Sequence, residues 1–109
     1  MRSGYVGSSF SAKVVPVAGR ALITCEGELD MDSADRLRRA VDDALAAEPV
    51  ALHIDCAEVT FIDSIGLRAL IHTDELCRAR GIPLMIIASD PVRRIIEMVG
   101  AALEISAPS

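Results

Sequence analysis

Two stretches of the chain have apolar residues at the three- and four-residue spacing of an amphipathic helix. The spacing predicts helices over 33–47 and 91–99. Asp32 or Ser33 is expected to cap the first and Asp90 the second, because short polar side chains accept hydrogen bonds from the first turn. The apolar stripes consist of Leu37, Val41, Ala44 and Leu45, and of Val92, Ile95, Ile96 and Val99.

Another helix is expected from Ser64, as its N-cap, to Arg80. Gly81 would end it in a left-handed conformation, and Pro83 cannot continue it. The apolar residues of its first two turns spread around most of the circumference. The helix therefore either packs on two sides or offers an apolar contact patch to a partner.

Five short runs are typical of strands, at 10–17, 21–26, 50–55, 84–88 and 103–106. A tight turn at 19–20 predicts that the first two form an antiparallel hairpin, and Pro16 indicates an edge strand. The continuous apolar run at 84–88 predicts a strand buried on both faces. Segments 27–31 and 56–63 are expected to be loops. One face of the third strand is predicted to carry Val50, Leu52 and Ile54.

Strands that alternate with helices predict parallel pairing through right-handed crossovers. The expected fold is α/β, with a mixed sheet of four to five strands that begins with the antiparallel hairpin. A single domain is expected over 10–106, preceded by a flexible tail over 1–9 that is rich in Gly and Ser.

The composition narrows the functions that the chain can have. It has 109 residues and a net charge of −5, which argues against binding nucleic acid or an anionic membrane surface. No apolar run reaches about 18 residues and no signal segment is visible, so a cytoplasmic protein that does not insert into membranes is expected. The cysteines Cys25, Cys56 and Cys77 are expected to be buried reduced thiols, with a redox pair of Cys25 and Cys56 as the alternative.

Catalysis is not expected from this sequence. A nucleophilic serine needs a base within hydrogen-bond reach. His72 lies eight residues after Ser64 on the predicted helix, about 12 Å along its axis, and His53 lies inside a strand. There is no phosphate-binding glycine loop and no cluster of metal ligands, so we expect a non-enzyme without cofactor or metal.

Ser64 has two physical uses at the start of a helix. Its hydroxyl can cap the first turn, or it can carry a phosphate, which adds nearly two negative charges at neutral pH. The N–H groups and the positive end of the helix dipole would tolerate the new anion, so that the surface changes and the fold does not.

The motifs around Ser64 resemble those of the STAS domain family, the bacterial anti-sigma-factor antagonists. The segment VTFIDSIGL at 59–67 is the most specific match, and the resemblance covers about residues 10–106. The other matching pieces, in the family's order, are GELD at 27–30, VALHID at 50–55, LMIIA at 84–88 and SDPVRRIIEMVG at 89–100.

The resemblance implies a binding switch. In this family a serine kinase that is also an anti-sigma factor binds the unmodified antagonist and thereby releases a sigma factor. The kinase then phosphorylates the serine that corresponds to Ser64, which breaks the complex, and a PP2C-type phosphatase restores the antagonist. The kinase supplies ATP and magnesium, so the antagonist needs no cofactor. When free, the domain is expected to be a monomer, because it closes its own core.

The resemblance also places acidic residues beside the switch, with Asp63 and Asp30 expected to contact the partner. Their alternative roles are a local turn and a loop cap. The expected partner surface continues through the start of the helix, over Ile65, Gly66, Leu67 and Arg68.

Two positions depart from the family pattern. Ile65 stands where Ser or Thr is common, which removes a second phosphoacceptor and is expected to place an exposed branched side chain at the partner surface. It marks an altered partner or a protein that is not phosphorylated. Arg68 stands where a small residue is common. It is four residues after Ser64 and therefore on the same helix face, where it is expected to pair with a phosphate on Ser64 or to remain a solvated charge.

A second interpretation is an accessory subunit of a lipid-transport ABC system or of a stress-sensing complex. Such a subunit would use the Ser64 surface to hold its partner, without turnover of phosphate.

Overall fold

The computed structural model describes residues 9–108, which form five strands and three helices. Residues 1–8 of the predicted tail lie outside this range, whereas Ser9 is described, and its carbonyl accepts a hydrogen bond from Glu28 N (3.0 Å). In chain order the elements are β1 (Phe10–Val17), β2 (Arg20–Leu29), α1 (Ala34–Ala46), β3 (Leu52–Ile62), α2 (Ser64–Arg80), β4 (Leu84–Ala88), α3 (Asp90–Val99) and β5 (Ile105–Ser106).

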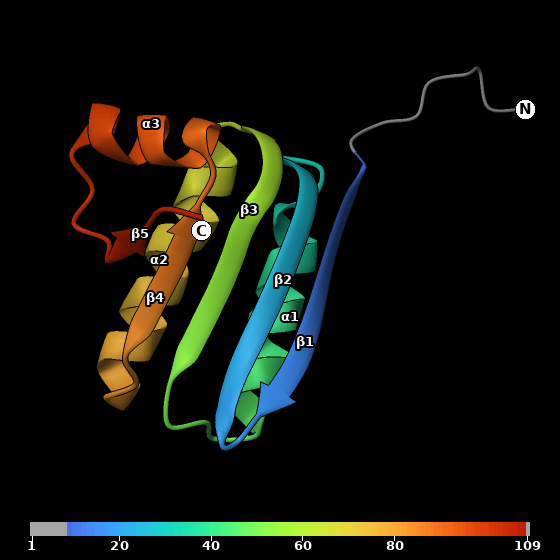
Figure 1. Ribbon diagram of the computed structural model, residues 1–109, viewed down its shortest axis with the longest axis vertical. Coiled ribbons are helices and arrows are strands. Elements are labelled where there is room, and N and C mark those ends of the chain that lie inside the picture. Colours follow the sequence, from blue (N-terminus) through green and yellow to red (C-terminus); the bar gives the residue numbers. More distant parts are fainter. Residues whose placement is uncertain (1–8, 109) are drawn as a thin grey trace, which may run out of the picture.

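The strands form one sheet in the order β1-β2-β3-β4-β5, in which β1 is antiparallel to β2 and the other pairs are parallel. Helices α1 and α2 lie side by side behind the sheet, and α3 crosses one end of it (Figure 1). This confirms the mixed α/β sheet that the sequence predicts. The crossovers are parallel because each passes through a helix on the sheet face.

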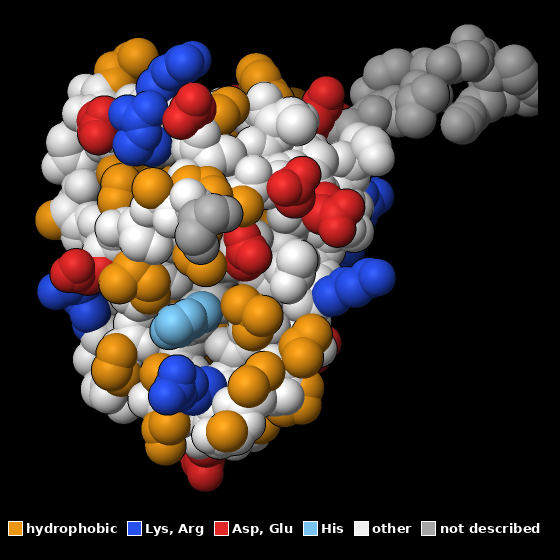
Figure 2. Space-filling view, in the orientation of Figure 1, with side chains coloured by type: hydrophobic (Ala, Val, Ile, Leu, Met, Phe, Trp, Pro, Cys, Tyr) orange, Lys and Arg blue, Asp and Glu red, His pale blue; other side chains and the backbone are white. Residues whose placement is uncertain are grey.

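The two faces of the sheet differ in their neighbours. One face packs on the helices, with Ile23, Ile54 and Ile86 opposite one another in register and fully buried. On the other face His53 pairs with Leu22 and Met85, all three half-buried. Figure 2 shows this face, with hydrophobic side chains around a histidine. The prediction that both faces of β4 are buried was therefore wrong, because no described helix covers the second face.

Strands β2 and β3 extend farther than the sequence predicts. The expected loops at 27–31 and 56–63 are largely strand, because pairing of β2 with β3 continues to Leu29 and Ile62 through two register shifts. Gly27 allows one of these irregularities, with a φ of +103° and no room for a Cβ beside Ser9 O. The extra length carries the ends of both strands to the start of α2.

Two of the helix caps lie one residue before those predicted. Asp63 is the N-cap of α2, not Ser64, and Ser89 is the N-cap of α3, not Asp90. Ser33 is the N-cap of α1 as expected, but its hydroxyl donates to Glu28 O (2.6 Å) and makes no capping bond. The predicted left-handed end of α2 is confirmed at Gly81, and α3 ends in the same way at Gly100.

Three smaller expectations also differ from the structure. The hairpin turn consists of Ala18 and Gly19, both with positive φ, and Arg20 already belongs to β2. Val50 is 70% exposed, because β3 begins only at Leu52. Val99 is 55% exposed at the end of α3, beyond the part of the helix that packs on the sheet.

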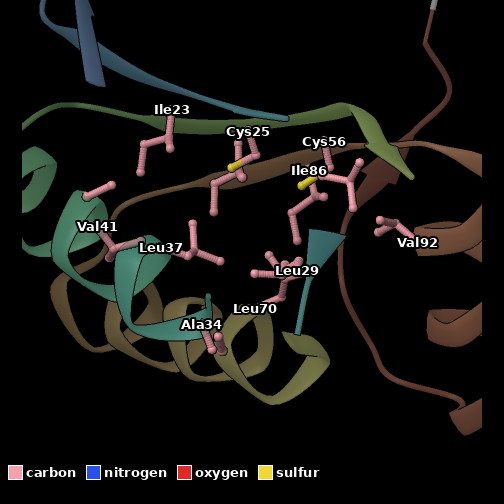
Figure 3. Packing of buried hydrophobic residues seen from close by; sticks show 14 of the residues in the cluster. Ile23, Cys25, Leu29, Ala34, Leu37, Val41, Cys56, Leu70, Ile86 and Val92 are labelled. Carbon is pink, nitrogen blue, oxygen red and sulfur yellow. The ribbon is translucent and has the colours of Figure 1, made fainter. Parts of the chain in front are cut away.

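Cys25 and Cys56 lie close together in the core, on neighbouring strands (Figure 3). They are free thiols, as is the buried Cys77, so the structure has reduced cysteines and no Cys25–Cys56 disulfide. The hydrogen bond with Cys25, followed by burial, raises the pKa of Cys56 well above its ordinary value. Cys56 is therefore a neutral core residue at physiological pH.

Helix α2 begins against the end of β2 at a contact between main-chain atoms. Gly66 is buried in the first turn, and a Cβ there would lie 2.3 Å from Leu29 O and 2.9 Å from Leu29 Cγ. Only glycine allows this approach, although its φ is ordinary for a helix.

We expect Gly66→Ala to lower the free energy of unfolding by about 2 kcal/mol, because the new methyl group must push α2 away from β2. Alanine is otherwise favoured over glycine inside a helix, so a neutral or stabilising effect in urea denaturation would contradict the close contact. Gly81→Ala is the control. That site is open but left-handed, and its cost should be about 1 kcal/mol from strain alone.

The raised pKa of Cys56 predicts a pH dependence. A folded-state pKa above the unfolded one gives stability that is present below the ordinary value of 9.0 and is lost as the pH rises beyond it. The difference in unfolding free energy between the parent and Cys56→Ala should thus shrink by about 1 kcal/mol from pH 7 to pH 10. The buried Val59 cannot ionise, so the cost of Val59→Ala should not change over the same range.

Candidate functional site

The candidate site lies where the parallel strands β2 and β3 end and the chain turns into α1 and α2. Leu29 and Ile62, the last residues of the two strands, are paired in register. The segment after β2 and the single residue after β3 therefore meet at one edge of the sheet, which is where α/β folds commonly place their functional residues.

Asp63 joins these two segments. Its Oδ1 accepts a hydrogen bond from Gly66 N (2.8 Å), which caps α2, and its Oδ2 accepts one from Met31 N (3.2 Å) in the segment after β2. Its own N–H donates to Leu29 O (3.2 Å). The carboxylate thus fixes the start of α2 and the chain between β2 and α1 at the same time.

Asp30 organises the start of α1. Its Oδ1 accepts hydrogen bonds from Asp32 N (3.0 Å) and Ser33 N (3.2 Å), and its carbonyl accepts one from Ala34 N (2.8 Å). Asp30 and Asp63 were both predicted to contact the partner, with a loop cap and a local turn as alternatives. The structure places both in capping interactions at the same end of the sheet.

Ser64 is the first residue of α2, and its side chain is exposed. Because Asp63 supplies the cap, the Ser64 hydroxyl is not needed for it, and it has no hydrogen-bond partner among residues 9–108. The hydroxyl is therefore held at a fixed place and is available for modification or for contact with another molecule.

The next four residues differ in exposure. Gly66 and Leu67 are buried, so they position the helix against the sheet. Ile65 was expected to be exposed but is half-buried and packs against the core, because the first turn lies close to the sheet. Arg68 is exposed one turn after Ser64, and no ion pair within residues 9–108 involves it.

Two exposed hydrophobic residues, which the sequence does not single out, lie at the end of the sheet where Asp63 joins the two segments. Met31 is 70% exposed next to Asp30, and Phe61 is 49% exposed just before the end of β3. Phe61 belongs to the segment FIDS, but the sequence predicts a loop there, because the expected strand ends at residue 55. Met31 and Phe61 therefore place apolar surface at the end of the sheet where α2 begins.

The rest of the described chain offers few groups for chemistry. In residues 9–108 no group of three or more His, Cys, Asp or Glu side chains could hold a metal ion. On the exposed side of α2, His72 Nδ1 lies 3.9 Å from Glu75 Oε1. None of the helices in this part of the chain combines the length and hydropathy that crossing a membrane requires.

Comparison with known proteins agrees with the fold. The curated anti-sigma-F factor antagonist RsfB of Mycobacterium tuberculosis is 36% identical over 67 residues. That alignment covers 62% of this chain and 55% of RsfB, so the chain matches about half the length of this relative.

Solved structures are similar over more of the chain. An anti-sigma factor antagonist from Mycobacterium paratuberculosis is 30% identical, with a TM-score of 0.82, over 93% of this chain and 87% of that one. SpoIIAA has the same fold at 15% identity in its unphosphorylated form (TM-score 0.72; 91% and 90% covered) and at 16% in its phosphorylated form (0.71; 93% and 92%).

The model of the STAS domain family matches residues 11–107, which include everything from β2 to α2 and nearly all of the sheet. The matched range contains the segment FIDS and the end of the sheet that Asp63 organises. The chain belongs to the STAS domain family.

Proposed function

We propose that this protein is an anti-sigma-factor antagonist whose binding to an anti-sigma factor is switched by phosphorylation of Ser64. The observation that carries the proposal is the exposed Ser64 hydroxyl, which has no partner in residues 9–108 and is held at the first residue of α2. The relatives named as anti-sigma factor antagonists support the same function.

The unmodified surface is suited to a protein partner. Met31 and Phe61 expose apolar side chains at the end of the sheet where α2 begins, and Arg68 adds a charge one turn along α2. An anti-sigma factor would bury the two apolar side chains, and the neutral hydroxyl of Ser64 would cost little to desolvate between them. Asp30 and Asp63 would shape this surface through their hydrogen bonds, and half-buried Ile65 would fill its floor.

Phosphorylation would oppose this contact. A phosphate on Ser64 brings close to two negative charges into a surface that is apolar when bound, and burying them without a partner is costly. The fold need not change, because the N-terminus of α2 favours an anion. SpoIIAA has this fold in both its unphosphorylated and its phosphorylated form, which supports a switch that acts at the surface.

The chain needs no catalytic group of its own for this cycle. The anti-sigma factor would act as the serine kinase and supply ATP and magnesium, and a PP2C-type phosphatase would reverse the modification. Because sigma factors act in transcription, the cytoplasm is the proposed place of action. Arg68, four residues after Ser64, would pair with the phosphate and stabilise the modified form.

The decisive experiment incubates the protein with each histidine-kinase-like anti-sigma factor of its organism and Mg-ATP. Intact-mass spectrometry should show one added phosphate with one of them, and none in Ser64→Ala. By titration calorimetry Ser64→Ala should bind that kinase like the unmodified parent, and Ser64→Glu should bind at least ten times more weakly. Ser106→Glu, at an exposed serine of β5, is the control and should bind like the parent.

Other outcomes would change the proposal in defined ways. A stable complex without any phosphate transfer would mean a constitutive antagonist. Absence of both complex and phosphate would contradict the proposal and favour the accessory subunit of a transport or stress-sensing complex.

The two hydrogen bonds that the Asp63 carboxylate accepts can be tested separately. In Asp63→Asn the amide oxygen can still accept from Gly66 N, but the amide nitrogen cannot accept from Met31 N. We expect hydrogen exchange of the Met31 amide to accelerate while Gly66 stays protected, with a loss of about 1 kcal/mol in unfolding free energy. Equal exchange of Met31 in the parent and the variant would show that the second bond does not hold this segment.

A further inference from the structure

Strand β1 and helix α1 enclose a groove at the edge of the sheet, formed by residues other than those around Ser64. Figure 1 shows β1 as the outermost strand, with α1 behind it. Two hollows of about 620 and 200 Å³ lie along this strand and share Val14 and Asp43. Small side chains leave the space open. The floor consists of Ala12, Val14, Ala40, Ala44 and Ala47.

The outer edge of β1 offers main-chain groups to this groove. Val17 and Arg20 flank the two-residue turn and form the hydrogen-bonded pair of the hairpin, and bonded and non-bonded pairs alternate from there. Ala12, Val14 and Pro16 are then in non-bonded positions, with their main-chain groups pointing outward.

Two observed hydrogen bonds agree with this alternation. Ala21, the partner of Pro16, donates its N–H away from β1, to Ala51 O (3.0 Å). Phe10, two residues before Ala12, turns its carbonyl outward to Arg36 Nη1 (3.2 Å). Since β1 is the first strand of the sheet, no described strand pairs with its outer edge.

The groove is positively charged in a protein of net charge −5. Lys13, Arg36 and Arg39 line it, and Asp43 is its only acidic lining residue among those described. No ion pair within residues 9–108 involves any of these four side chains. The charges are therefore available to a ligand of opposite sign.

We propose that this groove binds an extended, acidic and apolar segment of a partner protein, which adds to β1 as a sixth strand. Hydrogen bonds with the N–H and C=O groups of Ala12 and Val14 would hold its main chain. Because side chains alternate along a strand, apolar ones would enter the hollow beside α1 while acidic ones on the opposite face meet Lys13. The charges of Arg36 and Arg39 on α1 add to the attraction for an acidic segment. Pro16 has no N–H, so pairing would end there, after about five residues.

A second copy of this chain fits the groove poorly. Pairing of two β1 edges would bring Lys13 and Arg39 of one copy close to the same residues of the other, and like charges in such a contact are unfavourable. An acidic partner segment removes this repulsion and neutralises the groove.

The test uses two synthetic peptides of five residues, one alternating glutamate with valine and one alternating lysine with valine. We expect the acidic peptide to shift the ¹⁵N–¹H signals of Ala12, Val14 and Ala40 saturably, with a Kd of about 1 mM, and to slow hydrogen exchange of the Ala12 and Val14 amides. The basic peptide should do neither. Arg39→Glu should weaken binding at least tenfold, whereas Arg94→Glu, at an exposed arginine of α3, should not.

Several results would overturn the proposal. Equal binding of both peptides, or no saturable shift, would exclude a site for acidic segments. Shifts at Ala40 without protection of Ala12 and Val14 would exclude strand pairing. Protection of these two amides that rises with protein concentration in the absence of peptide would assign the edge to a second copy. No anti-sigma factor takes part in the test, so its result is independent of the switch at Ser64.

Discussion

The two oxygens of one carboxylate determine how the working end of this domain is assembled. Asp63 accepts from Gly66 N within α2 and from Met31 N in the segment after β2, at 2.8 and 3.2 Å. Both bonds satisfy main-chain donors at places where regular structure ends and would otherwise leave them unpaired. Every other feature of the site depends on this, because the exposed hydroxyl of Ser64 and the apolar side chains nearby keep their relative positions only if the two segments stay joined.

This arrangement separates two tasks that a serine at a helix start often combines. In a capping serine the hydroxyl accepts a hydrogen bond from the main chain. Here the side chain of the preceding aspartate accepts that bond, and the hydroxyl remains available. Modification of Ser64 would then remove no capping bond and leave the packing of α2 unchanged. The effect of the modification would then come entirely from the change of charge at the surface.

Much of the fold could be predicted from local patterns. The end of α2 is the one expected, because Gly81 and Pro83 mark it without ambiguity, and the hairpin at the start of the sheet follows from a two-residue turn. The ends of β2 and β3 could not be predicted. Their last residues alternate polar with apolar across irregular pairing, and Glu26 and Glu28 resemble loop residues until the neighbouring strand is known.

Only part of the candidate site could be predicted, because it too depends on contacts between segments that are distant in the sequence. The motif drew attention to Ser64 and Asp63, but a local pattern cannot decide which of these two adjacent residues caps the helix. Asp63 also accepts a hydrogen bond from Met31 N, 32 positions away in the sequence, and a local pattern does not contain this contact. The half-burial of Ile65 and the exposure of Phe61 likewise depend on how far β3 runs, which is a property of the sheet.

The approach of Gly66 to Leu29 has a consequence for how such domains diversify. Besides the bonds of Asp63, the place of the serine is set by the close approach of Gly66 to the Leu29 carbonyl, which does not involve the exposed side chains around it. Met31, Phe61 and Arg68 can be exchanged without moving the hydroxyl. The surface around the serine can therefore change its chemistry, and with it the kind of molecule that it would fit, while the serine keeps its place.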